Sequence, residues 1–156
     1  MISEIMYHPS GENGVDGDVF EFIELKNVSN QVMAMGGIHF IQGIDYTFED
    51  GVELAPGAFA VLVQDAEAFA SRYPGVPVTG VYEGRLNNGG EDVVLVHASG
   101  ASLTQVRYGD GEPWPILADG EGFSLVPFQT LSMESQDESL RWRASSLRGG
   151  TPGRDD

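Results

Sequence analysis

The stretch Glu21-Phe22-Ile23-Glu24-Leu25-Lys26-Asn27 decides the fold class of this chain. Ile23 and Leu25 share one parity and Glu24 and Lys26 the other, which predicts a β-strand over residues 19–26. Glu21 lies on the same side of this strand as Ile23 and Leu25, which are expected to point into the core. Its carboxyl group is therefore expected either at the rim of the sheet or buried against a cation. Because basic residues are scarce, the predicted partner is Arg141 or Arg143, and a bound cation is the alternative.

Short β-like runs lie on both sides of this stretch, and glycine, proline, asparagine and aspartate separate them. The predicted strands cover residues 2–7, 32–35, 38–44, 46–48, 52–54, 59–63, 92–97, 102–108 and 123–126. Residues 65–72 form the one convincing helix, with Asp65 as its N-cap and an end forced by Pro74-Gly75. The pattern is typical of an all-β domain with one short helix.

The 156 residues fit one domain, and the longest apolar run is far shorter than the ~20 residues that span a bilayer. Residues 1–127 are predicted to form the core. Residues 128–156 are polar but carry Trp142 between two arginines, so we expect an ordered extension packed on that core. Met1 leads directly into a predicted strand with no signal peptide, which suggests a domain linked to others in a longer chain.

The chain is strongly acidic, with 8 basic and 24 acidic residues and a formal charge of −16. Such a surface lacks the cations that bind DNA, RNA or anionic membranes, so neither nucleic-acid binding nor membrane insertion is expected. The acidity fits solubility or a salty or extracellular setting, and calcium binding is the more specific explanation. The absence of cysteine excludes disulfides, thiolate metal sites and cysteine nucleophiles.

Several segments, in their order and spacing, resemble the lamin tail domain, above all the versions in secreted bacterial proteins. They include residues 22–27, Gly36-Gly37-Ile38-His39-Phe40, residues 46–56 and the predicted hairpin 92–108. Trp114-Pro115, residues 118–125 and the ending 142–153 are similar to the extension of the bacterial members. At position 38 this chain has isoleucine where the family commonly has tryptophan.

This resemblance implies an immunoglobulin-like β-sandwich. It also implies a non-catalytic interaction or structural accessory module in an exported or cell-surface multidomain bacterial protein. The partner would be a protein or polysaccharide of unknown identity, and the expected location is secreted or on the cell surface. The alternative function is a carbohydrate-binding or calcium-stabilised adhesion module.

The sequence contains no recognisable catalytic motif. His8, His39 and His97 are the general acid–base candidates, but no GxSxG elbow, HExxH helix or phosphate-binding glycine loop accompanies them. We therefore expect no enzymatic activity and no required cofactor, with calcium as the alternative cofactor.

Two acidic loops have the composition of a calcium site, residues 12–18 and residues 110–112 with 119–121. Asp16, Asp18 and Asp119 are the candidate ligands, although neither loop has the EF-hand spacing. A solvated acidic loop is the competing interpretation.

Four aromatic residues lie in or near loop-rich sequence and are candidates for a platform that binds sugars or peptides: Tyr82, Tyr108, Trp114 and Trp142. In the competing interpretation, the two tryptophans fill the space between the extension and the sheet.

Overall fold

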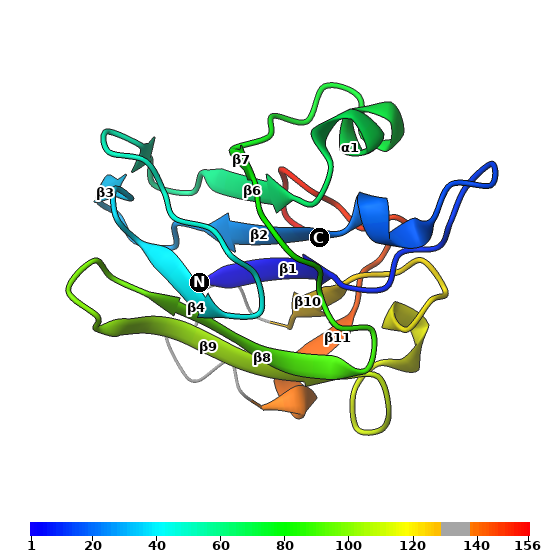
Figure 1. Cartoon of the computed structure of the whole chain (residues 1–156). Helices are drawn as coiled ribbons and strands as arrows, with labels where there is room; N and C mark the ends of the chain where they lie inside the picture. Colours follow the sequence, from blue (N-terminus) through cyan, green and yellow to red (C-terminus); the bar gives the residue numbers. More distant parts are fainter. Residues whose placement is uncertain (129–137) are drawn as a thin grey trace.

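The computed structural model describes residues 1–128 and 138–156. One sheet has six strands, in the order β11 (Trp142–Ala144), β10 (Leu125–Pro127), β1 (Ile2–Met6), β2 (Phe22–Lys26), β6 (Phe59–Val63) and β7 (Gly80–Val81). A second sheet has the order β4 (His39–Gln42), β8 (Gly90–Val96) and β9 (Ser102–Gly109). β3 (Met33–Ala34) and β5 (Glu53–Leu54) form a two-stranded sheet. The first two sheets face each other as the layers of a sandwich (Figure 1).

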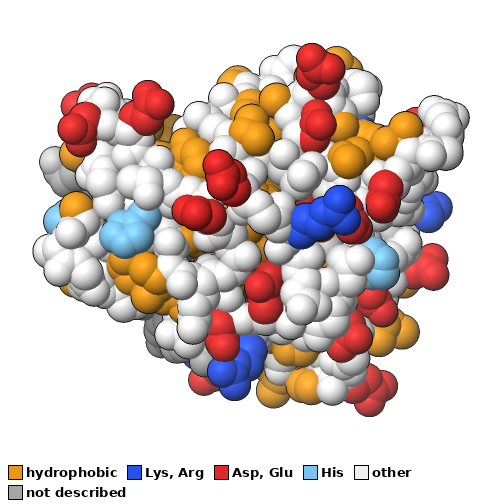
Figure 2. Space-filling view, in the orientation of Figure 1, with side chains coloured by type: hydrophobic (Ala, Val, Ile, Leu, Met, Phe, Trp, Pro, Cys, Tyr) orange, Lys and Arg blue, Asp and Glu red, His pale blue; other side chains and the backbone are white. Residues whose placement is uncertain are grey.

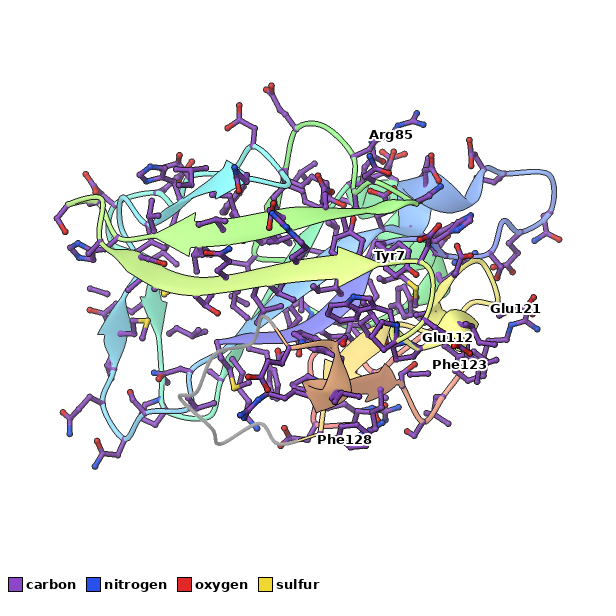
Figure 3. The ribbon with its side chains drawn as sticks, turned by 90° about the horizontal axis from the view of Figure 1, so that it is seen from below. Tyr7, Arg85, Glu112, Glu121, Phe123 and Phe128 are labelled. Atoms are coloured by element: carbon purple, nitrogen blue, oxygen red, sulfur yellow. The ribbon has the colours of Figure 1, made fainter. Side chains whose placement is uncertain are left out.

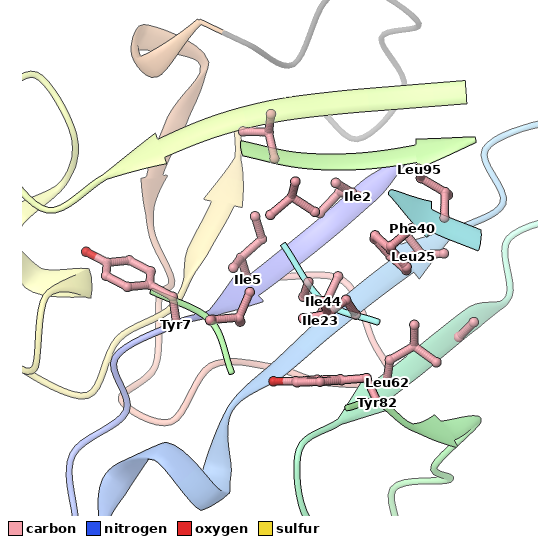
Figure 4. Close-up of a cluster of buried hydrophobic side chains, with 14 of the residues drawn as sticks. Ile2, Ile5, Tyr7, Ile23, Leu25, Phe40, Ile44, Leu62, Tyr82 and Leu95 are labelled. Atoms are coloured by element: carbon pink, nitrogen blue, oxygen red, sulfur yellow. The ribbon is translucent and has the colours of Figure 1, made fainter. Parts of the chain in front are cut away.

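The main core fills the space between these two layers. Ile23 and Leu25 of β2 point into it and meet Ile5 of β1 and Phe40 and Leu95 of the second sheet (Figure 4). β2 pairs antiparallel with both β1 and β6, so it lies in the middle of the six-stranded sheet. The predicted alternation of β2 is therefore confirmed on its inward face, which carries the core side chains.

Helix α1 (Ala66–Arg72) covers part of the opposite face of the six-stranded sheet (Figure 1). Phe22 and Val63 pack there against Phe69 of the helix, and the rings of Phe22 and Phe69 meet edge to face with centroids 5.8 Å apart. Asp65 caps the helix as predicted, because its side chain accepts a hydrogen bond from the amide of Ala68. β2 is thus buried on both faces, because α1 covers Phe22 and the C-terminal residues 153–155 contact Glu24 and Lys26.

The predicted strand 19–26 is wrong at its beginning. Gly17–Phe20 forms a short 3-10 helix, η1, and β2 begins only at Phe22. Asp16 caps η1 by accepting from the amide of Asp18, and the guanidinium group of Arg72 lies 3.4 Å from the ring centre of Phe20. These local bonds and the α1 contact outweigh the strand preference of the sequence.

β6 matches the predicted 59–63, and β8 and β9 are slightly longer than predicted. β1, β3, β4, β5 and β10 are shorter than predicted or shifted by one or two residues, and β7 and β11 were not predicted. Residues 46–48 form no strand of a described sheet, but they make an isolated bridge between His39 and Thr47 and further backbone hydrogen bonds to residues 37–40. The predicted hairpin is confirmed, since β8 and β9 pair antiparallel along their whole length.

Part of the C-terminal extension packs on the sandwich. Its strand β11 joins β10, the last strand of the predicted core, through the pairs Leu125–Ala144, Val126–Arg143 and Pro127–Trp142, and β10 joins β1. The short 3-10 helices η2 (Ile116–Ala118) and η3 (Ser139–Arg141) flank these strands. Residues 129–137 of the predicted extension lie outside the described residues.

Candidate functional site

Two glutamates lie side by side on the outer face of the six-stranded sheet. Glu4 of β1 and Glu24 of β2 are directly paired in register, and each is about 1% exposed. Ser3 donates a 2.6 Å hydrogen bond to Oε1 of Glu24, and Ser124 donates to Oε1 of Glu4. Like-charged residues directly opposite each other destabilise a sheet, so this pair requires a structural explanation.

The explanation is the last segment of the chain, residues 149–156, which we call the C-terminal strap. The amide of Thr151 donates to Oε1 of Glu4 at 2.9 Å, and the amide of Gly153 donates to Oε2 of Glu24 at 2.6 Å. Gly150 has a φ of 76°, and a Cβ atom there would lie 2.1 Å from Oε1 of Glu4. Only glycine therefore allows the strap to approach the carboxyl group this closely.

Two ion pairs hold the end of the strap. Lys26 of β2 donates to Asp155, and Arg143 of β11 donates to Oδ1 of Asp156. Asp156 also accepts a 2.8 Å hydrogen bond from the amide of Ser146. The strap thus connects β1, β2 and β11, three strands from opposite ends of the sequence.

Burial beneath the strap changes the acidity of both glutamates. Removal from water raises the pKa of Glu4 to about 8 and that of Glu24 to about 7, although the hydrogen bonds that each accepts act in the opposite direction. The negative charge of Glu24 contributes to the rise in the pKa of Glu4. Both carboxyl groups are therefore expected to change between the protonated and the ionised form near neutral pH.

A third buried carboxylate, Glu21, corrects our prediction for that residue. It is fully buried, so the rim position is wrong. Its Oε2 accepts from the amide of Leu86 at 2.8 Å and from the hydroxyl of Tyr82 at 3.1 Å. Its Oε1 accepts no hydrogen bond, and burial raises the pKa of Glu21 to about 7.

The predicted pairing of Glu21 with Arg141 or Arg143 is also wrong. Arg141 pairs with Glu138 at 3.0 Å, and Arg143 pairs with Asp156 of the strap. The parity argument located the side chain correctly but could not identify its donors, because Leu86 is brought there by a loop distant in sequence. Arg85, whose positive charge lowers the pKa of Glu21 slightly against the effect of burial, lies at the periphery in Figure 3.

The four aromatic candidates do not form an exposed platform. Tyr82, Tyr108 and Trp142 are 3%, 2% and 3% exposed, and all three belong to the main core. Trp114 is partly buried against that core, with its ring centre 6.3 Å from that of Trp142. The structure therefore supports the competing interpretation, in which the tryptophans fill the space between the extension and the sheet.

The acidic candidates for calcium have other partners. Asp16 caps η1, Asp18 accepts from Arg85 at 2.9 Å, and Asp119 lies 2.6 Å from Nδ1 of His8. Within residues 1–128 and 138–156, no three histidine or acidic side chains are arranged to hold a metal ion. The exposed Glu112 and Glu121 lie near each other at one end of the molecule (Figure 3).

The three histidines have separate local partners. His8 contacts Asp119, the Nδ1 of His39 lies 3.0 Å from the carbonyl oxygen of Gly37, and that of His97 lies 2.9 Å from the hydroxyl of Ser99. None of these contacts joins a histidine to a buried glutamate. The described residues thus contain three buried carboxyl groups with raised pKa values, and each of them accepts a hydrogen bond from a backbone amide of the chain itself.

Comparison with protein families agrees with this architecture. The family model for the Lamin Tail Domain matches residues 1–110. The chain belongs to the lamin tail domain family. This lamin tail domain is an immunoglobulin-like β-sandwich, and members of the family are generally non-catalytic interaction modules. No curated protein and no solved structure matched the chain.

The matched residues end at Asp110, directly after β9. Both glutamates of the Glu4–Glu24 pair lie within the match, whereas β10, β11 and the C-terminal strap lie beyond it. Sequence reasoning did not identify this pair. The signals available were a glutamate at the centre of each of two strands and the glycine-rich Gly149-Gly150-Thr151-Pro152-Gly153 turn.

Proposed function

We propose that this lamin tail domain is a non-catalytic interaction or structural accessory module of an exported or cell-surface multidomain bacterial protein. The observation that carries the proposal is the use of its buried carboxyl groups. Glu4, Glu21 and Glu24 each accept a hydrogen bond from a backbone amide of the chain itself. A catalytic carboxylate must reach its substrate. These three carboxyl groups are instead buried and accept hydrogen bonds from the chain itself.

The surface supports a partner without strong negative charge. Acidic side chains outnumber basic ones on the face shown in Figure 2, in keeping with the formal charge of −16. A protein or a polysaccharide fits this surface, whereas a nucleic acid would be repelled. Among the described residues, no helix is long and apolar enough to cross a membrane.

The alternatives receive less support. Stacking on a sugar requires exposed aromatic rings, and three of the four candidates are in the core. Calcium-stabilised adhesion remains a prediction, which a calcium-selective rise in the melting temperature would support.

The parent protein allows a direct experiment. Deletion of the domain is expected to leave the turnover of a neighbouring catalytic domain on a soluble substrate unchanged. It should also reduce retention of the protein on the cell surface or on an insoluble substrate. Substrate turnover by the isolated domain on hydrolase, phosphatase or nuclease panels, abolished by one point substitution, would refute the proposal.

A further inference from the structure

The C-terminal strap covers two acidic groups that would otherwise face water. Glu4 and Glu24 are opposite each other on adjacent strands, and each uses one carboxylate oxygen to accept a strap amide. The hydroxyl groups of Ser124 and Ser3 donate to the same two carboxyl groups from the sheet. Because the strap supplies amides and excludes water at once, its docking and the ionisation of the pair are physically linked.

The charged and titratable groups around the pair come from β2, β11, the end of α1 and the strap. Lys26 lies on β2, Arg143 on β11, and Arg154, Asp155 and Asp156 on the strap. Tyr73, whose hydroxyl donates to the carbonyl oxygen of Gly149 at 2.7 Å, faces Glu4 from the end of α1. Lys26 and Arg143 already pair with Asp155 and Asp156. Their direct ion pairs are therefore with the strap aspartates, although the charge of Lys26 also lowers the pKa of Glu24 to some extent.

We propose that the C-terminal strap is a pH-dependent latch, which lies on the sheet while the Glu4–Glu24 pair retains a proton and lifts off when both carboxyl groups ionise. With the strap docked, two adjacent carboxylates would both be charged without water, which is strongly unfavourable. With the strap lifted, water solvates both charges. The glycines at 149 and 150, both with positive φ, form the natural hinge.

The direction of the effect follows from linkage. Burial, to which the docked strap contributes, raises the pKa of Glu4 to about 8 and that of Glu24 to about 7 from an ordinary value of 4.5, although the strap amides of Thr151 and Gly153 act in the opposite direction. Loss of protons therefore favours the open form. The opening constant rises by about tenfold per pH unit for each carboxyl group, until the pH reaches the pKa of the closed form. The strap should be closed in mildly acidic solution and open increasingly above neutrality.

This proposal goes beyond the accessory role and can be tested on the full chain. Because the chain has no cysteine, spin labels can be placed at Ser71→Cys on α1 and Arg154→Cys on the strap. Both positions are exposed. Pulsed electron paramagnetic resonance then measures the distance between them from pH 5 to pH 9. One short distance is expected at pH 5, with a longer and broader population that grows at least about a hundredfold relative to it by pH 9.

Variants distinguish the latch from other effects. Glu24→Gln should reduce the steepness of the transition by about one proton, and Glu4→Gln with Glu24→Gln should abolish it. Glu53→Gln removes an exposed carboxyl group on β5 and should leave the transition unchanged. An unchanging distance from pH 5 to pH 9, or the same transition in the double variant, would overturn the proposal. So would a matching change between labels at Ser71→Cys and Ser102→Cys, which would indicate unfolding of the sandwich.

Discussion

Replacement of Glu21 by glutamine gives the sharpest test of how this lamin tail domain buries its acids. Oε2 of Glu21 accepts from the amide of Leu86 and the hydroxyl of Tyr82, and glutamine retains an oxygen for those donors. Oε1 has no donor, and glutamine replaces it with an uncharged amide nitrogen. The substitution therefore removes a titratable group while it preserves the shape of the side chain.

The expected effect depends on pH. Burial raises the pKa of Glu21 from 4.5 to about 7 in the folded protein. The folded state therefore holds a proton that the unfolded state loses between these values. The stability that this group contributes is fully present below pH 4.5 and is lost as the pH rises through 7. At about 1.4 kcal/mol per pKa unit, the loss amounts to about 3 kcal/mol.

Glu21→Gln should be free of this loss. Near pH 4.5 the variant and the natural protein should differ by less than about 1 kcal/mol, because a protonated carboxyl group and an amide are both neutral. By pH 8 the variant should be more stable by about 3 kcal/mol. Urea denaturation followed by tryptophan fluorescence at several pH values measures the difference.

Glu53→Gln, at an exposed position of β5, is the matched control and should follow the natural protein at every pH. If Glu21→Gln also runs parallel to the natural protein between pH 4.5 and 8, Glu21 is not a buried titrating group. A variant that is less stable at pH 8 would show that the carboxylate has a charged partner, as the sequence had suggested.

Three further outcomes are expected. Trp142→Ala should lower the free energy of unfolding by about 3 to 5 kcal/mol in urea denaturation, because this core side chain is only 3% exposed; a loss below about 1 kcal/mol would mean that the extension adds little. Gly150→Ala and Gly14→Ala introduce the same left-handed backbone cost, but only Gly150 faces a buried carboxyl oxygen, so calorimetry should show a larger loss at Gly150 by at least about 1 kcal/mol. Millimolar calcium and magnesium should raise the melting temperature equally by screening a charge of −16; a calcium-selective rise that disappears in Asp16→Asn or Asp119→Asn would instead establish a calcium site.

Local pattern was sufficient for much of the architecture. Alternation in residues 22–26, the Asp65 cap and the β8–β9 hairpin depend on neighbours close in sequence, and all three were predicted. The start of β2 was not, because Arg72 of α1 holds Phe20 in a 3-10 turn. A contact between residues so far apart has no signature in a local pattern.

The sequence by itself determined the all-β class, the acidic surface and the family, and it placed Glu21 on the inward side of its strand without deciding between the rim and the core. Composition, alternation and turn residues act over a few positions, and each can be read without knowing which strands meet. Only the tertiary structure decided that Glu4 and Glu24 lie opposite each other and that the last eight residues, 149–156, cover them. These contacts bridge up to 147 residues of sequence, and a donor at that separation is selected by sheet order and chain path. Local sequence preferences determine neither the order of the strands in the sheet nor the path of the chain.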